Sequence, residues 1–208
     1  MKKFIKKIFL LFGFKIIPVK ATKSSNSHRL ISSLPSATFE NISLLMEYYT
    51  SAKKGGVFVQ VGANDGETSD SVNQYVKREK MQSILVEPIP RVFEKLSNFY
   101  QGVDCVTLEN CAIGRESGEQ VIFAVKNEGR WQGNEWASQL ASFGRDHLIR
   151  HAISEDEIEE LRVPVYSIAD LATKHGITHI DVLLIDVEGF DHEVVHCALD
   201  MEKTPSCI

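Results

Sequence analysis

The sequence predicts an α/β fold in which helices cover both faces of a mostly parallel sheet. Three short apolar segments each run into a turn rich in glycine or acidic residues, at residues 57–66, 81–88 and 182–193. Apolar runs of this length are typical of strands that are buried on both faces. Because ligands bind outside the carboxyl ends of the strands in open α/β sheets, we expect the three turns to meet at one ligand-binding edge.

The first turn ends the segment V-F-V-Q-V-G-A-N-D-G, Val57–Gly66. Its valines are β-branched and suit the interior of a sheet. Gly62 and Gly66 lack a Cβ, which lets the main chain turn sharply and approach a ligand. Residues 68–70 then offer N-cap groups for a helix whose first amides face the same turn. A plain strand-to-helix turn also uses glycine, so this loop alone does not separate the two interpretations.

The second turn carries Glu87, which lies 21 positions after Gly66. At this distance the acid of a nucleotide-binding βαβ unit accepts hydrogen bonds from ribose hydroxyls. The glycine pattern is G-x-x-x-G and lacks the G-x-G-x-x-G spacing that holds a pyrophosphate. The pattern therefore favours a cofactor with a ribose and no phosphates. The alternative is that Glu87 is a solvated strand end.

The third turn follows the apolar run Val182–Ile185 and carries acidic residues and one histidine. Asp186 and Glu188 come first, and Asp191 and His192 follow within the same stretch. We expect ligand chemistry here because the turn shares its sheet edge with the other two. Alternatively, Glu188 and Asp191 serve the N-terminus of the next helix, where the helix dipole favours acids.

Four motifs in this order resemble those of the FkbM-type, S-adenosylmethionine-dependent methyltransferases. They are V-Q-V-G-A-N-D-G, I-L-V-E-P, L-E-N-C-A-I-G and L-L-I-D-V-E-G-F-D, and the resemblance covers about residues 40–208. It implies a class I methyltransferase (Rossmann-like) fold with S-adenosylmethionine as cofactor. It also implies O-methyl transfer to a hydroxyl of a sugar, a glycan or a small metabolite.

The resemblance implies a role for each matching site residue. These residues are Gly62, Asn64, Asp65 and Gly66 along the methionine part of the cofactor, Glu87 at the ribose, Asn110, Cys111 and Ala112 around the adenine, and Asp186 and Glu188 at the methyl-transfer end. The protein then has to align the acceptor oxygen and take its proton. Asp186, Glu188 and His192 are the candidates for this base. Alternatively, the carboxylates hold a divalent ion that acidifies the acceptor hydroxyl, and the spacing does not decide between these mechanisms.

Two other classes of function stay open. A different nucleotide-dependent enzyme, such as a dehydrogenase, is disfavoured because G-x-G-x-x-G is missing. A non-catalytic or degenerate scaffold with the same fold is disfavoured by the intact set of Gly62, Glu87 and Asp186. The short C-terminal part favours it, because the chain stops at residues 204–208, where a fifth strand is expected to start. Residues 182–185 would then be an exposed edge strand, so we expect a shortened form or self-association there.

Composition limits the partners and the compartment. The net charge is −5, which leaves no electrostatic basis for binding nucleic acid. The four cysteines form no C-x-x-C pair, and Cys105 and Cys197 fall in apolar segments where small buried residues are expected. A reducing, cytoplasmic location is therefore the expectation.

The chain divides into three predicted parts, at residues 1–20, 21–38 and 39–208. The first has six lysines and no acids, and its longest apolar run, residues 8–14, is far short of the roughly 20 residues that span a bilayer. We expect it to be a basic amphipathic helix, either on an anionic membrane surface or packed on its own domain. The second part is polar and predicts a linker.

The remaining elements are predicted from local patterns. They are helices at 39–52, from Pro90 and at 167–176, and strands at 104–108, 120–125 and 161–166. Residues 127–142 show no clear period and contain Trp131 and Trp136. We expect an aromatic loop there, either as a flap over the acceptor or as a surface loop that its tryptophans hold in place.

Overall fold

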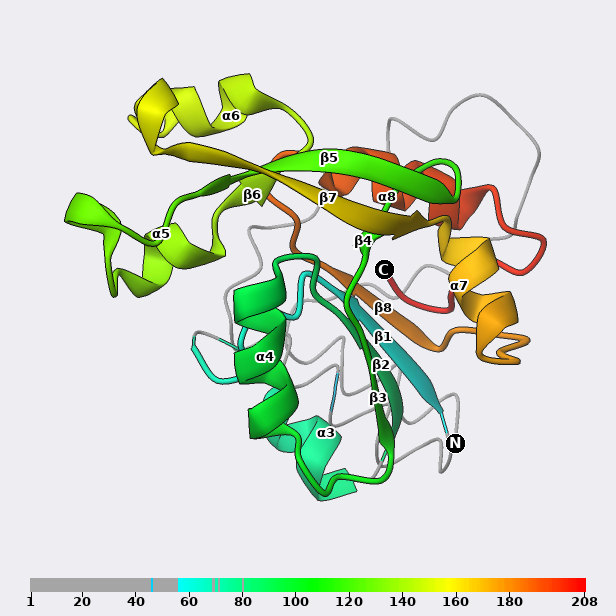
Figure 1. The fold of residues 1–208 in the computed structure, drawn as a ribbon. Coiled ribbons are helices and arrows are strands. Elements are labelled where there is room, and N and C mark those ends of the chain that lie inside the picture. Colours follow the sequence, from blue (N-terminus) through cyan, green and yellow to red (C-terminus); the bar gives the residue numbers. More distant parts are fainter. Residues whose placement is uncertain (1–45, 47–55, 69, 71, 80) are drawn as a thin grey trace, which may run out of the picture. The chain divides into compact units, whose positions relative to one another are not determined.

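The computed structural model describes residues 46, 56–68, 70, 72–79 and 81–208, which all belong to one compact unit, Thr38–Ile208 (Figure 1). The predicted basic helix at 1–20, the linker at 21–38 and almost all of the predicted helix at 39–52 lie outside the described residues. Their boundaries and the membrane contact therefore stay predictions. Among the helices that are described, none has the length and apolar character needed to cross a bilayer.

The first sheet, sheet A, is parallel throughout and has the strand order β3-β2-β1-β8. Its strands are β1 (Val57–Val61), β2 (Gln82–Val86), β3 (Val106–Glu109) and β8 (Val182–Ile185). Val61 pairs with Val86 on one side and with Ile185 on the other. The residues that follow these three strand ends therefore emerge side by side, which confirms the predicted meeting of the three turns.

Helices cover both faces of sheet A, as predicted. They are α3 (Asn73–Glu79) and α4 (Pro90–Phe99) on one face, and α7 (Ile168–Lys174) and α8 (Asp191–Leu199) on the other. Alternation along β1 explains this arrangement. Phe58 packs with Leu96 of α4, whereas Val59 packs with Leu171 of α7 and Val194 of α8. Burying each such side chain contributes about 1.5–3 kcal/mol.

Capping chemistry sets the ends of α7 and α4. The Ser167 side chain accepts a hydrogen bond of 3.0 Å from the Asp170 amide, and Gly176 beyond the helix has φ +64°. Pro90 occupies the first turn of α4, where its missing amide hydrogen has no cost. These three features agree with the sequence analysis.

The predicted strands at 120–125 and 161–166 exist, but they belong to a second sheet that the sequence analysis did not predict. Sheet B has the order β4-β7-β5-β6 and is mixed. Its strands are β4 (Ala112–Ile113), β5 (Gly118–Val125), β6 (Ala141–Ser142) and β7 (Ile158–Tyr166). The antiparallel β5–β7 pair runs from Gly118↔Val165 to Val125↔Ile158. Polar residues alternate along β7, so one of its faces is solvated.

The loop expected at residues 127–142 contains short regular elements, and its role as a flap or as a surface loop stays a prediction. The segment contains η3 (Gly129–Trp131), α5 (Glu135–Gln139) and β6, and α6 (Arg145–Arg150) and η4 (Glu155–Glu157) follow it. Local caps explain the order, because the Asn134 side chain accepts a hydrogen bond of 3.0 Å from the Ala137 amide. Elements of two to five residues are too short to show a sequence period.

Arg91 of α4 connects the two sheets. Its guanidinium donates to Glu159 of β7 at 2.6 Å and to the carbonyl oxygen of Val125 at 2.6 Å. A weaker contact reaches the carbonyl oxygen of Ser138 at 3.4 Å. The helix that follows Glu87 is therefore held against both ends of the segment that contains η3 and α5.

Cys207 pairs with the outer edge of β8 through a parallel bridge to Val182. The Leu183 amide donates to the Cys207 carbonyl at 2.9 Å, and the Cys207 amide donates to the Asp181 carbonyl at 3.1 Å. This is the place where the sequence analysis expected a further strand. Self-association at this edge stays a prediction. Cys105 and Cys197 are half-buried where full burial was expected, and Cys111 is the buried cysteine.

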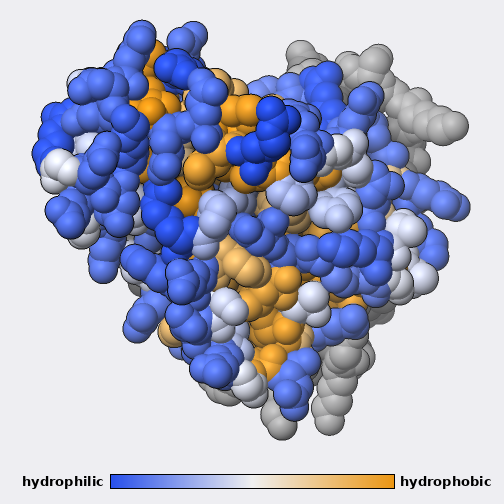
Figure 2. All heavy atoms as spheres, in the orientation of Figure 1, coloured by the Kyte–Doolittle hydropathy of each residue, from blue (hydrophilic) through white to orange (hydrophobic). Residues whose placement is uncertain are grey.

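Hydrophilic residues cover most of the face seen in Figure 2, and apolar residues reach the surface in separate areas over its middle. Trp136 of α5 is 51% exposed and Ile149 of α6 is 40% exposed. Two of the large exposed apolar side chains therefore belong to the short helices beside sheet B.

Candidate active site

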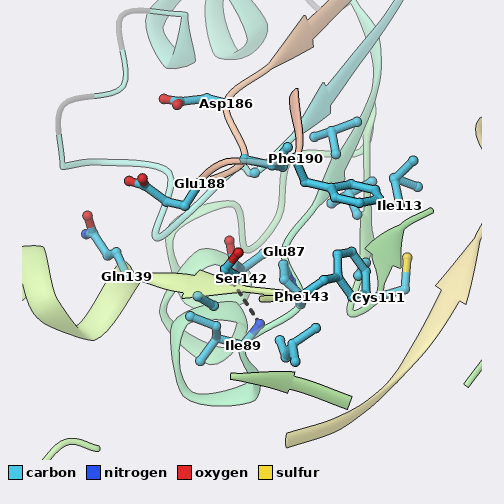
Figure 3. Close-up of a pocket in the computed structure, with 18 residues that line it drawn as sticks. Glu87, Ile89, Cys111, Ile113, Gln139, Ser142, Phe143, Asp186, Glu188 and Phe190 are labelled. Atoms are coloured by element: carbon cyan, nitrogen blue, oxygen red, sulfur yellow. Dashed lines mark hydrogen bonds between the residues drawn. The ribbon is translucent and has the colours of Figure 1, made fainter. Parts of the chain in front are cut away.

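Two adjoining hollows lie at the carboxyl edge of sheet A. The first encloses about 570 Å³ and the second about 790 Å³, both including space that is open to solvent. Such volumes suit a small-molecule cofactor together with part of an acceptor. The residues that line both hollows are Gly62, Glu87, Gln139, Asp186 and Glu188. The two hollows therefore form one continuous pocket, and Figure 3 shows the residues of the first.

One end of the pocket is apolar. The rings of Phe143 and Phe190 lie with their centroids 4.8 Å apart, and Ile89 and Ile113 add aliphatic surface nearby (Figure 3). Cys111 and Ala112, which the resemblance places around the adenine, line this end. Surfaces of this kind bind a flat ring through packing, with few polar contacts.

Glu87 lies between the apolar end and the polar end of the pocket. It is 5% exposed, and its carboxylate accepts hydrogen bonds from the amides of Asn64 at 3.1 Å and Ile89 at 2.9 Å. Burial raises the pKa of this carboxyl to about 7, although the two amide donors oppose the shift. The alternative of a solvated strand end is thereby excluded, and Glu87 has an ionisation that is sensitive near neutral pH.

The turn after β1 has a conformation that glycine alone tolerates at its first position. Gly62 has φ +82°, and a Cβ there would lie 2.0 Å from the carbonyl oxygen of Asp186. Asn64 has φ +55° and lines the second hollow. Gly62 therefore permits the close approach of the β1 and β8 ends and forms part of the pocket wall at the same time.

Asp65 holds the turn after β1 together through hydrogen bonds. Its carboxylate accepts hydrogen bonds from the Glu67 amide at 3.0 Å, the Thr68 amide at 2.7 Å and the Thr68 hydroxyl at 2.7 Å. Burial alone would raise its pKa, but these hydrogen bonds outweigh burial, and the pKa lies below its usual range. Asp65 thus shapes the loop and lies outside the residues that line the two hollows.

Two further residues that were predicted to bind the cofactor, Gly66 and Asn110, support the turns around the pocket. A Cβ on Gly66 would lie 2.8 Å from the Tyr100 ring, so this glycine lets the turn pack on α4. The Asn110 amide group donates to the carbonyl oxygens of Glu87 at 2.8 Å and Pro88 at 3.2 Å. Neither residue lines the hollows, and both position the residues that do.

The polar end of the pocket holds Asp186 and Glu188, which project from the end of β8, with Gln139 of α5 on the same side (Figure 3). Burial raises the pKa of Asp186, and the nearby charges of Glu188 and Asp191 raise it further. The Asp191 carboxylate accepts a hydrogen bond from the Val187 amide at 3.0 Å and holds the loop. The helix-terminus alternative therefore applies to Asp191, whereas Glu188 lines the pocket.

His192 does not reach the pocket. Its side chain is 69% exposed and lies 3.2 Å from Glu193 on the surface of α8. The sequence placed it near the third turn, but the first turn of α8 carries it away from the carboxyl edge. The prediction that His192 could act as the base in this pocket is therefore wrong.

Several pocket residues were missed by the sequence analysis. They are Gln60, Asp70, Trp136, Gln139, Phe143 and Phe190. Gln60 has a recognisable signal, because it is a polar residue inside an otherwise apolar strand. Its amide nitrogen donates to Asp70 at 3.3 Å, and its amide oxygen is buried without a partner. Trp136 and Gln139 of α5 and Phe143 after β6 have no such signal, because their positions depend on how sheet B docks.

The charge of the pocket has one sign. Glu87, Asp70, Asp186 and Glu188 line it, and no lysine or arginine is among the described residues that form its walls. A phosphate group would meet carboxylates there without a cation to balance it. The walls therefore suit a cofactor that carries positive charge.

A parallel sheet with helices on both faces and a pocket at its carboxyl edge define a doubly wound α/β protein, a class in which ligands bind at that edge. The sequence model of the methyltransferase FkbM domain matches residues 60–204, so the chain belongs to the FkbM methyltransferase family and has a class I methyltransferase-like fold. The predicted fold, family and enzyme class are thereby confirmed. No curated protein matches the chain significantly.

Proposed function

We propose that the protein is an S-adenosylmethionine-dependent O-methyltransferase that acts on a hydroxyl of a sugar, a glycan or a small metabolite. The observation that carries the proposal is the anionic polar end beside an apolar slot, without a cationic side chain among the described wall residues. S-adenosylmethionine has a positive sulfonium, a positive ammonium and no phosphate. A dinucleotide has two phosphates, so the same walls disfavour the dehydrogenase alternative.

The donor and acceptor groups of the pocket fit this cofactor. Glu87 would accept hydrogen bonds from the ribose hydroxyls, and Phe143 and Phe190 would enclose the adenine. The unpartnered oxygen of Gln60 offers an acceptor for the ammonium group, in a place where Asp70 adds negative charge. A buried polar atom without a partner is costly in the free protein, so a ligand donor would remove that cost.

The remaining chemistry falls to the residues at the polar end. The cofactor supplies an electrophilic methyl group when it is bound. Asp186 and Glu188 would orient the acceptor hydroxyl toward that methyl group and exclude competing water. The raised pKa of Asp186 suits a carboxylate that takes the hydroxyl proton as the new carbon–oxygen bond forms.

The mouth of the pocket supports an acceptor with an apolar face, such as a sugar ring. Trp136 lines the second hollow and is 51% exposed. An exposed indole offers a flat surface on which the C–H face of a sugar packs. The hydroxyls of such an acceptor would then reach the carboxylates at the strand ends.

Calorimetric titration with S-adenosylmethionine and with S-adenosylhomocysteine tests the cofactor. We expect one site and an increased melting temperature with each ligand. A titration with reduced nicotinamide dinucleotide, followed by its fluorescence, is the matched control and should show no binding. Folded protein that produces no heat with either adenosyl ligand would refute the proposal.

Transfer is tested separately from binding. Incubation with S-adenosylmethionine and candidate glycans or metabolites should add about 14 Da to an acceptor, the mass of a methyl group that replaces hydrogen at an aligned hydroxyl. Cofactor binding without transfer to any hydroxyl acceptor would favour the non-catalytic scaffold.

A further inference from the structure

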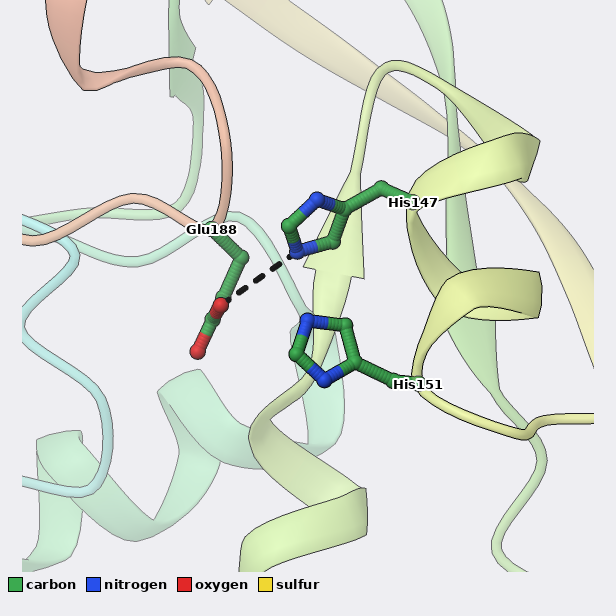
Figure 4. Close-up of side chains that lie close together, drawn as sticks. All are labelled: His147, His151 and Glu188. Carbon is green, nitrogen blue, oxygen red and sulfur yellow. Dashed lines mark hydrogen bonds and ion pairs between the residues drawn. The ribbon is translucent and has the colours of Figure 1, made fainter.

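Three metal-ligand side chains from two distant segments meet at the mouth of the pocket (Figure 4). His147 lies in α6, His151 caps the C-terminal end of that helix, and Glu188 follows β8. One ligand atom from each residue lies within 4.8 Å of the others. The two histidines are four positions apart, the spacing that places side chains on the same side of a helix.

We propose that His147, His151 and Glu188 form a site for a divalent transition-metal ion of the zinc type. Two imidazoles with one carboxylate are a ligand set that such ions accept, and three protein ligands leave a coordination position open. The site differs from the acidic cluster considered from the sequence, because two of its three ligands come from α6. Asp186, Asp191 and His192 are not part of it.

The distance between His147 and Glu188 fits coordination better than direct hydrogen bonding. His147 Nε2 and Glu188 Oε2 are 3.4 Å apart. A charge-assisted N–H···O bond is typically about 2.7–2.9 Å, so the direct contact is a poor one. Two ligands at tetrahedral positions about 2.1 Å from a zinc ion are about 3.4 Å apart, which is the separation observed.

The neighbours of the two imidazoles hold them in place. Gly189 has φ +81°, and a Cβ there would lie 2.7 Å from His147 Nδ1. The missing side chain therefore lets the His147 ring lie directly on the main chain beside Glu188. The rings of His147 and His151 have centroids 4.8 Å apart, and His151 packs against Trp136 at 6.2 Å. These contacts orient the two imidazoles, and the three ligand atoms, which lie within 4.8 Å of one another, would draw together to tetrahedral spacing when an ion binds.

Glu188 also borders the pocket. It lines both hollows together with Asp186, and its side chain is 46% exposed. An ion held by Glu188 would therefore lie beside the polar end of the pocket. An acceptor hydroxyl bound there would have a lowered pKa, because a bound cation stabilises the alkoxide. Metal binding itself does not depend on the proposed cofactor.

Cobalt(II) is the probe for the test, because its visible absorption reports the ligand set. The full chain, stripped of metal with a chelator, is titrated with Co²⁺, and Zn²⁺ is then added as competitor. We expect one equivalent of Co²⁺ with d–d bands that Zn²⁺ removes. His147→Ala, His151→Ala and Glu188→Gln should each weaken binding by about 100-fold or more, since even the loss of a group that hydrogen-bonds to a metal ligand costs about 10–100-fold.

The chain contains a matched control for adventitious binding. His192 and His196 have the same four-residue spacing on α8, and both are exposed. The double variant His192→Ala/His196→Ala should bind Co²⁺ as the wild type does. Circular dichroism melting checks the fold of His151→Ala and Glu188→Gln, which change exposed side chains. Absence of specific Co²⁺ binding in the wild type, or binding that survives both His147→Ala and His151→Ala, would overturn the proposal while leaving cofactor binding untouched.

Discussion

The carboxyl edge of sheet A and the short helices beside sheet B form opposite walls of one pocket, yet different forces hold them. At the sheet edge, main-chain amides fix Glu87, and the side chain is almost fully buried. On the other wall, ring contacts hold His151 and Trp136, and Trp136 is half exposed. The first wall is fixed by main-chain contacts, whereas the second presents an aromatic surface to solvent.

The largest expected effect is at Gly62. Gly62→Ala would place a Cβ 2.0 Å from the Asp186 carbonyl oxygen, in a turn with φ +82°. We expect the free energy of unfolding to fall by about 3 kcal/mol or more, because both strand ends must move. Urea denaturation measures this loss.

Gly129→Ala is the matched control, because Gly129 has φ +58° and open space around its Cβ position. It should cost only the backbone strain, about 1–2 kcal/mol. Equal losses in the two variants would show that the approach of β1 to β8 is not what requires a glycine at position 62.

The next effect concerns how the free energy of unfolding depends on pH. Burial raises the pKa of Glu87 from 4.5 to about 7 in the folded protein, so the folded state holds this proton more tightly than the unfolded state. Its contribution to stability is fully present below the unfolded pKa and is lost as the pH rises through about 7. The loss is on the order of 3 kcal/mol.

Urea denaturation between pH 5 and pH 8 tests this dependence. Glu87→Gln cannot ionise, so its stability should fall less over this range than that of the wild type. Asp70 and Asp186 also have raised pKa values through burial, and they act equally in both proteins. Parallel pH profiles of the two proteins would contradict the assignment of the change to Glu87.

Cofactor affinity should depend on pH in the opposite direction. Ionised Glu87 accepts ribose hydrogen bonds, so Glu87→Gln should weaken S-adenosylmethionine binding at pH 8 by about 1–3 kcal/mol. The difference should shrink at pH 6, where the wild-type carboxyl holds its proton. Calorimetry at the two pH values measures both, and a difference that stays constant would argue against ribose recognition by Glu87.

The smallest effect concerns the open wall. Trp136→Ala should raise the KM for a sugar acceptor by roughly 2- to 10-fold, the equivalent of about 0.5–1.5 kcal/mol of aromatic packing. Cofactor affinity should change less than the KM, since Trp136 lies outside the apolar hollow that would hold the adenine. A loss of cofactor binding would mean that α5 supports the sheet edge as well.

The same contrast explains how much of the molecule could be predicted from its sequence. Parallel strands leave strong local patterns, and Val57–Val61 and Val182–Ile185 were assigned from a few residues each. Gly62, Glu87 and Asp186 could be placed at one edge because each directly follows such a strand. For this wall, the place of a residue in the fold follows almost directly from its place in the sequence.

The opposite wall could not be predicted in this way. Gln139 lines the pocket, and His147 and His151 reach Glu188 at its mouth, because sheet B docks with α5 and α6 facing the strand ends. That docking depends on long-range contacts such as Arg91 with Glu159, which no local pattern shows. His192 is the converse case, because it is near Asp186 in the sequence while the first turn of α8 points it into solvent.

The position of Arg91 has a consequence for how the two ligands bind. Its charge acts on Glu87, and its guanidinium holds the carbonyl oxygens of Val125 and Ser138 at the two ends of the segment that carries Trp136. A cofactor that binds ionised Glu87 therefore strengthens the attraction between Glu87 and Arg91. Arg91 then holds the segment that carries Trp136 more firmly. We expect positive cooperativity between cofactor and acceptor, and thermodynamic linkage requires the same factor in both directions. Arg91→Met should reduce that factor toward one in paired titrations, with either ligand added first.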